Sequence, residues 1–309
     1  MNQIIEMQTY IAVIEAGSIT NAAKRLGITK SVVSQRIQQL EKRLATALIH
    51  RGRTMQCTDA GQEFYQQSIK ILAELSHLEE SISAHHDHLR GNFRLSVPQG
   101  FSIRYLAADL AEFMKMYPDL KLDIESSDYF VNLNNGNYDV AIRMGELPDS
   151  NLISQTIAEN RHYICASPDY LQTHGTPTHP NELFRHRGLL YLPREPHGMW
   201  QLPVDGERAF FRISPYMRSD SGHQLLEAAK LGLGIAILPG FLAADAICQQ
   251  QLKVILPAFS PSGGNISVVY RVSNRASPKI QALVQFLSKK IGHTPSWDIA
   301  IQKTIQQSV

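Results

Sequence analysis

Apolar residues recur every three or four positions through residues 3–44, which is the spacing of amphipathic helices. A first helix is predicted over residues 3–16, and Gly17 ends it. Ser18 suits the start of a second helix, ITNAAKRL, because its hydroxyl can accept a hydrogen bond from a backbone amide of the first turn. Ala22 and Ala23 are small enough to let another helix cross closely. The pattern therefore predicts two helices that pack together.

A third helix is predicted after a short turn. Gly27 can adopt the positive φ that a tight turn between helices needs, and Thr29 or Ser31 can cap a helix that runs to about Leu44. Its inward face is apolar and comprises Val33, Ile37, Leu40 and Leu44. Its outward face is polar or basic and comprises Lys30, Ser31, Ser34, Gln35, Gln38 and Gln39, with Arg36 at the edge. The order of elements predicts a helix-turn-helix.

A heptad pattern follows the head. Thr58 can cap a long helix that begins near Asp59, whose charge suits the positive end of the helix. Spacings of four and three residues then relate Phe64, Ser68, Ile71, Leu75, Leu78, Ile82, His85 and Leu89. We expect this seam to pack against a second copy of the helix in a homodimer. A core helix of one large domain is the alternative.

From Gly91 onward, short apolar runs alternate with helical patterns, which indicates βαβ units and a mostly parallel sheet. We expect a second lobe to begin near Cys165 and the chain to return late to the first lobe, so that two crossings frame a hinged cleft. The predicted organisation is an α/β protein with an all-α N-terminal part: a head at 1–58, a linker helix at 59–90, and a body at 91–309, with lobe I at about 91–164 and 266–292 and lobe II at about 165–265.

Charge is unevenly distributed along the chain. The 309 residues have a net charge of +2. Residues 1–58 hold eight Lys or Arg and three acids, whereas residues 59–90 hold two Lys or Arg and six acids. A small basic head beside an acidic connector is typical of a polyanion-binding module. A solvated basic face that binds nothing is the alternative.

Composition narrows the class of protein. Hydrophobic residues at 43% and charged residues at 19% are ordinary for a globular protein and exclude long disorder and collagen repeats. No apolar run approaches the roughly 18 to 20 residues that span a bilayer, and the first 17 residues hold two Glu and no basic residue, unlike a signal peptide. Cys57, Cys165 and Cys248 form no C-x-x-C pair. We expect a cytoplasmic protein without membrane contact.

The outward face of the third helix is chemically suited to duplex DNA. Ser, Gln, Lys and Arg donate hydrogen bonds to base edges and phosphates, and no acid interrupts the face before Glu41. Beyond this helix, Arg51 and Arg53 flank a glycine in a predicted hairpin, a wing that can reach phosphates or the minor groove. Similar helical corners occur in proteins that do not bind DNA, and the hairpin could be an ordinary surface turn.

The stretch from Ser18 to Gly61 resembles the signature of LysR-type transcriptional regulators. The matching positions are Ser18, Thr20, Ala22, Ala23, Leu26, Val33, Ser34, Ile37, Leu40, Glu41, Leu48, Arg51, Thr58, Ala60 and Gly61. The chain departs from the family pattern at Thr46, where a Gly is common, and in Leu48-Ile49-His50, where the family usually has Leu-Phe followed by a polar residue; both lie away from the DNA face. The resemblance implies a winged helix-turn-helix that binds double-stranded operator DNA as a homodimer or homotetramer and contacts RNA polymerase.

The resemblance also implies that Thr20, Ser31, Ser34 and Arg36 contact the operator and that Arg51 and Arg53 serve the wing. The chemistry of the outward face adds Lys30 and Gln35. The predicted DNA-binding residues are therefore Thr20, Lys30, Ser31, Ser34, Gln35, Arg36, Arg51 and Arg53.

The stretches DVAIRMGELPDSNLI and GLGIAILPGFLA resemble the effector domain of the same family, which implies a two-lobed fold like that of periplasmic binding proteins. In open α/β sheets, ligands lie at the carboxyl ends of strands, near helix N-termini. On that rule the predicted effector-binding residues are Gln99, Gly100, Phe101, Ser102, Ser126, Ser127, Asp128, Arg143, Trp200, Ser219, Asp220, Pro239 and Phe241.

Alternatives remain open for several of these residues. Trp200 and Phe241 could belong to the core, and Asp220 could be only a helix cap. Because Arg143 accompanies Asp128, the charge of the effector is undecided, with an anion the expectation from the resemblance. The resemblance ends near Ile291, and the tail 292–309 has no predicted role.

Motifs of enzymes and metal sites are incomplete in the sequence. Gly232-x-Gly234 lacks the third glycine of a dinucleotide fingerprint, and Gly100–Arg104 lacks the last glycine of a nucleophile elbow. No ligand pattern completes a metal site around His85, His86 and His88. We expect no enzyme, metal or cofactor, but a transcriptional regulator whose DNA contacts respond to a small-molecule effector bound between the two lobes. A ligand-binding protein or cleft enzyme with an accessory DNA-binding module is the alternative.

Overall fold

The computed structural model describes residues 2–50, 56–82, 89–129, 131–133, 137–147, 150–195 and 197–307. The chain divides into two compact units. The first unit comprises Met1–Leu89, Asn132–Asp139 and Arg271–Ile280, and the second comprises Arg90–Val131, Val140–Tyr270 and Gln281–Val309.

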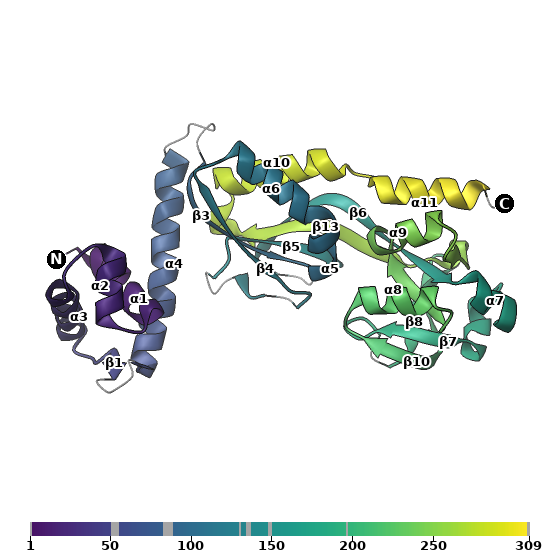
Figure 1. The fold of residues 1–309 in the computed structure, drawn as a ribbon, viewed down its shortest axis with the longest axis horizontal. Coiled ribbons are helices and arrows are strands. Elements are labelled where there is room, and N and C mark those ends of the chain that lie inside the picture. The colour runs from purple at the N-terminus through teal and green to yellow at the C-terminus, as the bar shows by residue number, and fades with distance from the viewer. Residues whose placement is uncertain are drawn as a thin grey trace. The chain divides into compact units, whose positions relative to one another are not determined.

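The first unit begins with three helices, α1 (Gln3–Ala16), α2 (Ile19–Leu26) and α3 (Lys30–Leu44), which confirm the predicted helix-turn-helix (Figure 1). The caps are those that the sequence predicts: Ser18 Oγ accepts a hydrogen bond from Asn21 N at 3.1 Å, and Thr29 Oγ1 accepts one from Val32 N at 3.5 Å. Gly27 lies in the turn between α2 and α3 with φ 66°, a conformation that glycine adopts without strain.

Ten of the described residues form the buried core of the helical head. They come from all three helices and from the segment after α3, and comprise Tyr10, Ala12, Val13, Ala22, Ala23, Val33, Ile37, Leu40, Leu48 and Ile49. Tyr10 lies at the centre, where its hydroxyl donates to Leu48 O at 3.0 Å and its ring meets Phe64 edge-on at 5.3 Å. Burial of one face of α3 fixes which of its residues point outward.

A short antiparallel hairpin follows α3. Strand β1 (Ile49–His50) pairs with β2 (Gln56–Cys57), in the position predicted for the wing. The tip between the strands, with the predicted contacts Arg51 and Arg53, lies outside the described residues.

Helix α4 (Asp59–Ile82) follows the hairpin. Thr58 caps it as predicted, with its hydroxyl accepting a hydrogen bond from Gly61 N at 3.0 Å. The predicted seam extends to Leu89, but residues 83–88, including His85, His86 and His88, lie outside the described residues. Within the described seam, Ile71 is 46% exposed, so this apolar side chain is uncovered in the single chain.

The second unit is built on a sheet whose described strands run in the order β10-β7-β11-β6-β13-β5-β3-β4, with β12 paired to β6. Strand bounds are β3 (Gly91–Val97), β4 (Leu120–Ser126), β5 (Val140–Gly145), β6 (Leu152–Ala166), β7 (Arg187–Tyr191), β10 (Ser214–Ser219), β11 (Ile235–Pro239), β12 (Lys253–Val254) and β13 (Ser262–Arg271). A separate hairpin joins β8 (Met199–Val204) to β9 (Glu207–Arg212). Parallel pairing links β3 to β4 and β5, and β7 to β10 and β11, as the alternating pattern predicts.

The long strands β6 and β13 are neighbours at the middle of this sheet. On one side, β13 pairs with β5, and on the other, β6 pairs with β11, so the two strands join a first lobe (β3–β5) to a second lobe (β7–β12). The chain thus crosses between lobes twice. The expected lobe boundaries after residues 164 and 265 fall inside β6 and β13.

Helices connect the strands and cover the sheet (Figure 1). A helical run after β3 consists of α5 (Gln99–Phe101), the π-helical turn η1 (Ser102–Leu106) and α6 (Ala107–Met116). The second lobe contributes α8 (Gly222–Lys230) and α9 (Gly240–Cys248). The remaining elements are α7 (Pro168–His174), η3 (Pro180–Arg185), η4 (Pro257–Phe259), η5 (Val272–Asn274), α10 (Pro278–Ile291) and α11 (Ser296–Gln307).

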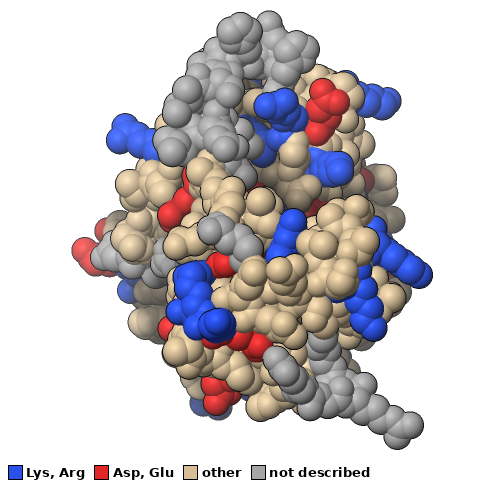
Figure 2. Space-filling view, turned by 90° about the vertical axis from the view of Figure 1, so that its left-hand side faces the viewer, with Lys and Arg blue, Asp and Glu red and all other residues tan. Residues whose placement is uncertain are grey.

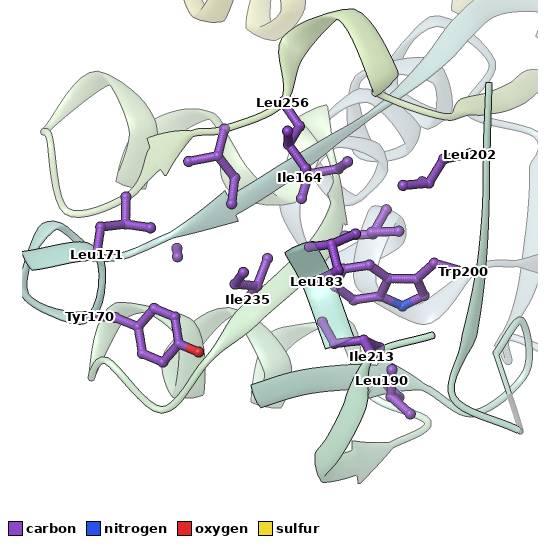
Figure 3. Close-up of a cluster of buried hydrophobic side chains, with 13 residues drawn as sticks. Ile164, Tyr170, Leu171, Leu183, Leu190, Trp200, Leu202, Ile213, Ile235 and Leu256 are labelled. Carbon is purple, nitrogen blue, oxygen red and sulfur yellow. The ribbon is translucent and has the colours of Figure 1, made fainter. Parts of the chain in front are cut away.

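The second lobe has its own hydrophobic core, shown in Figure 3. Trp200 belongs to it, together with Leu183, Leu190 and Ile213, and no part of its side chain is exposed. The prediction that Trp200 contacts the effector is therefore corrected: every second side chain of a strand faces the same way, and this one faces the core. Trp200 is therefore a core residue, which is the alternative that the sequence left open.

Among the described residues, no helix has both the length and the apolar character needed to cross a bilayer.

Candidate functional site

The outward face of α3 is the first candidate site. Lys30, Ser31 and Gln35 are exposed, and Ser34 is partly covered. Thr20, at the start of α2, is also exposed. Because Val33, Ile37 and Leu40 fill the core on the opposite face, the polar side chains can point only outward.

Arg36 lies at the edge of this face and is anchored to α1. Its guanidinium donates from Nη1 to Thr9 Oγ1 at 3.2 Å, and Thr9 in turn donates to Ile5 O at 2.7 Å. A guanidinium has five donors, so an anchored arginine can still donate to a phosphate or base. The contact limits the directions in which Arg36 can reach.

The acids of the head are engaged within the fold. Arg43 donates to buried Glu6 at 2.6 Å, and Glu15 pairs with Arg25 at 2.6 Å. Lys and Arg side chains stand as separate groups on the face of the molecule shown in Figure 2. The distribution leaves the outward side of α3 with polar and basic groups up to Glu41.

Glu41 joins α3 to the wing. Its Oε1 accepts hydrogen bonds from Leu48 N at 2.8 Å and from Ile49 N at 3.2 Å, at the start of β1. Gly61 lies on the other side of the same backbone, where an added Cβ would be 2.0 Å from Leu48 O. The Glu41 carboxylate thus ties the start of the wing to α3, and the close approach of Gly61 ties it to α4.

The second candidate site is a cavity of about 690 Å³ within the second unit. Its lining includes residues that follow the carboxyl ends of β3, β5, β7 and β11, and therefore comes from both lobes. This is where open α/β sheets bind ligands, and the volume is within the usual range for small-molecule pockets.

Part of the predicted effector set lines this cavity. The structure brings together Gln99, Gly100, Phe101, Ser127, Asp128, Arg143, Pro239 and Phe241. Asp128 is already engaged: its Oδ1 accepts from Gln99 N at 2.9 Å and its Oδ2 from Tyr191 Oη at 3.5 Å, which ties the first lobe to the second.

Other predicted residues do not line the cavity. Besides Trp200, these are Ser102, Ser126, Ser219 and Asp220. Ser102 is buried in the helical run after β3, and Ser126 is exposed at the end of an edge strand. Ser219 shapes the turn before α8 by accepting from Ser221 N at 2.9 Å. For Ser102, Ser126 and Asp220, the next residue in sequence lines the cavity instead, and an effector contact of the four residues stays a prediction.

Arg143 is a buried cation on the cavity wall. It is 6% exposed, and it donates from Nη2 to Ser96 Oγ at 2.9 Å and from Nη1 to Ile142 O at 3.0 Å. These hydrogen bonds fix the guanidinium against β3 and β5. An arginine stays protonated in proteins, so this wall carries a permanent positive charge.

A second group of charged residues in the lining was missed from the sequence. Arg194 donates to His162 Nδ1, and its Nε lies 3.5 Å from Glu195 Oε1. Burial, reinforced by the charge of Arg194, lowers the pKa of His162 to about 3, so this imidazole is neutral at physiological pH. The signal that could have revealed Arg194 and Glu195 is their place just after β7, at another carboxyl end.

Further charged residues and helix ends from both lobes complete the lining of the cavity. Glu146, which follows β5, pairs with Arg208 of β9, and both side chains are exposed. Helix α8 begins at the cavity with Gly222, and Pro239 and Phe241 line it at the start of α9, so the first turns of both helices lie near its wall. The lining thus offers cations, carboxylates and amide donors to a small polar molecule.

Two family models match most of the chain. The model of the bacterial regulatory helix-turn-helix proteins of the lysR family matches residues 4–62, and the model of the LysR substrate binding domain matches residues 86–291. The chain is 36% identical over 271 residues to an uncharacterized HTH-type transcriptional regulator of Haemophilus influenzae, covering 87% of this chain and 94% of that protein. It is 32% identical to the HTH-type transcriptional activator TtdR of Escherichia coli K12, covering 92% of each.

Solved structures show the same architecture. The structure of CrgA, a LysR-type transcriptional regulator from Neisseria meningitidis, has a TM-score of 0.60 at 28% identity and covers 95% of this chain and 100% of that one. Full-length AphB of Vibrio cholerae has a TM-score of 0.55 at 27% identity, covering 93% and 98%. With a helix-turn-helix head, a two-lobed body and these matches along most of its length, the chain belongs to the LysR family of transcriptional regulators.

Proposed function

We propose that the protein binds operator DNA through α3 and the wing, in the cytoplasm, and that a small molecule in the cavity changes those contacts. The observation that carries the proposal is the pairing of two features in one chain of this family: an outward helix face without acids before Glu41, and a charged cavity between two lobes. The residues proposed to reach the operator are Thr20, Lys30, Ser31, Ser34, Gln35, Arg36, Arg51 and Arg53.

The proposed assembly is a homodimer or homotetramer held by α4. Ile71 is exposed on the predicted seam of this helix, and an apolar side chain in that position favours a second helix as its cover. Two copies would then place two α3 helices on two half-sites, so the operator would be palindromic. Contact with RNA polymerase completes the proposed regulatory role.

The proposed effector is a small polar molecule bound by residues of both lobes. The residues that we retain for this role are Gln99, Gly100, Phe101, Ser127, Asp128, Arg143, Pro239 and Phe241, and the cavity lining adds His162, Arg194 and Arg208. A molecule that contacts both lobes binds one arrangement of them better than others, and this difference in affinity is what shifts the population of the regulator.

The operator is tested by capturing sheared genomic DNA on the purified protein and sequencing the bound fragments. A recovered fragment is then titrated at increasing salt, where each phosphate contact is expected to contribute roughly −0.9 to the slope of log K against log salt. A slope of several units with a shared palindrome supports the proposal. Affinity that does not change with salt contradicts it.

The effector is tested by a thermal-shift screen of small metabolites against the full chain. Each compound that raises the melting temperature is recovered from the protein and identified by mass spectrometry. Recovery of the compound unchanged supports a regulator without catalysis. Its conversion to a product would favour the rival function, a cleft enzyme with an accessory DNA-binding module.

A further inference from the structure

Helix α11, at the C-terminal end of the described chain, is not explained by the proposed function. It spans Ser296–Gln307 and lies beyond residue 291, where the match to the LysR substrate binding domain ends. It packs along α9 (Figure 1). Its buried face consists of Trp297, Asp298 and Ile301. Two of these three side chains lie directly behind the effector cavity.

Trp297 packs against the cavity wall of the first lobe. Its ring centroid is 4.3 Å from that of Tyr105 and 5.9 Å from that of Phe101. Phe101 lines the cavity and meets Phe241 of the second lobe edge-on at 5.3 Å. Trp297 therefore supports, from behind, the aromatic contact at which the two lobes meet.

Asp298 packs against the wall of the second lobe. Its side chain is fully buried, and Tyr163 Oη donates to its Oδ1 at 3.0 Å. An added Cβ on Gly240 would lie 2.2 Å from this oxygen, so the carboxyl group fits against α9 only because residue 240 has no side chain. Gly240 stands between Pro239 and Phe241, which both line the cavity.

The far end of α11 is attached to the same helix of the second lobe. Thr304 Oγ1 lies 3.5 Å from the sulfur of Cys248, the last residue of α9. Contacts therefore run from the first residue of α9 to its last. Because α11 is fixed to the second lobe in this way, its contact with Tyr105 and Phe101 is the part that must break when the lobes separate.

We propose that α11 is a strap that sets the spacing of the two cavity walls, with Trp297 and Asp298 as positioning residues for effector binding. This inference rests on the proposed function, because the walls in question are those of the effector cavity. The strap favours the arrangement of lobes in which Trp297 keeps its aromatic contacts, and a ligand that prefers another arrangement must compete with them.

Hydrogen–deuterium exchange on the full-length protein tests the strap without any ligand. The variants are Trp297→Leu, which removes the aromatic contact, Trp297→Phe, which keeps an aromatic ring, and Ile299→Ala, a control on the exposed side of α11. We expect Trp297→Leu to raise the exchange rate of amides 99–106 roughly tenfold. Trp297→Phe should restore slow exchange, and Ile299→Ala should match the wild type.

A purely structural role for Trp297 would give a different result. Hydrogen exchange would then rise evenly over the whole second unit, and Trp297→Phe would not slow the exchange of amides 99–106 more than that of other amides. Either that pattern, or unchanged exchange at 99–106 in a folded Trp297→Leu protein, overturns the strap.

Tyr105→Leu tests the same contact from the first lobe, should Trp297→Leu fail to fold. The double variant with Trp297→Leu should exchange no faster than either single variant, because both remove one contact. Rates that multiply in the double variant contradict the coupling. Operator binding and thermal-shift results on the wild type do not enter this test, so failure of the strap and failure of the proposed function are separate outcomes.

Discussion

Replacing Asp298 by Asn should make the second unit more stable at neutral pH than the wild type. The Asp298 side chain is fully buried, and its Oδ2 has no hydrogen-bond partner among the described residues. Burial raises the pKa of this carboxyl group from 3.8 to about 6, against the opposing effects of Tyr163 and Arg161. Asparagine keeps an oxygen that can accept from Tyr163 Oη and carries no charge.

The sign of the pH dependence follows from the direction of this shift. Between the unfolded pKa of 3.8 and the folded pKa of about 6, Asp298 is protonated in the folded protein and ionised in the unfolded chain. Folding therefore takes up a proton, and the free energy of unfolding of the wild type falls as pH rises through this window. A shift of about two pKa units corresponds to roughly 3 kcal/mol, fully lost above about pH 7.

Urea unfolding followed by tryptophan emission measures this effect in the relevant unit alone, because both tryptophans, Trp200 and Trp297, lie in the second unit. The free-energy difference between Asp298→Asn and wild type should be near zero around pH 4 and should grow to roughly 3 kcal/mol in favour of the variant by pH 7. Taking the difference cancels the titration of groups common to both proteins. Parallel curves for the two proteins across this range would show that Asp298 does not take up a proton on folding.

Three further predictions concern the head and the linker. Gly61→Ala places a Cβ 2.0 Å from Leu48 O, so calorimetry should show that this variant destabilises the head by about 3 kcal/mol. The neighbouring substitution Gln62→Ala should leave the stability of the head unchanged, and equal melting temperatures of the two variants would contradict this expectation. Glu41→Gln weakens the bonds to Leu48 N and Ile49 N, so operator affinity in anisotropy titrations should fall roughly threefold to tenfold, with Glu15→Gln as control; unchanged affinity would show that the wing does not depend on Glu41. Ile71→Asp should dissociate the dimer in sedimentation experiments, and Gln66→Asp, on the opposite side of the same helix, should not; a stable Ile71→Asp dimer would remove α4 from the interface.

The head could be predicted almost completely from the sequence because its signals are local. Ser18 and Thr29 cap helices where the pattern places them, and Gly27 takes a positive φ in the predicted turn. Helical periodicity alone assigns Val33 and Leu40 to the core. Each of these features depends on residues within one or two turns, which a sequence displays directly.

The cavity lining could be predicted only in part. The ends of the predicted strands indicate which region of the fold holds the cavity, but they do not indicate in which direction each side chain points. Ser127 lines the cavity and its neighbour Ser126 does not, since adjacent residues near a strand end face opposite ways. His162 lies within a long strand that crosses between the lobes, so no turn marks it. Packing of α11 behind the cavity depends on contacts across more than one hundred residues, such as Tyr163 with Asp298, which no local pattern reveals.

A single comparison of binding decides whether the outward face of α3 reads operator DNA. The recovered operator and a scrambled duplex of equal length are titrated by fluorescence anisotropy with wild type, Gln35→Ala and Gln8→Ala, the last an exposed glutamine on α1. We expect Gln35→Ala to lose roughly 1 to 3 kcal/mol of preference for the operator and Gln8→Ala to keep the wild-type preference. A Gln35→Ala protein that discriminates as well as wild type, together with an equally unaffected Ser34→Ala protein, would contradict it.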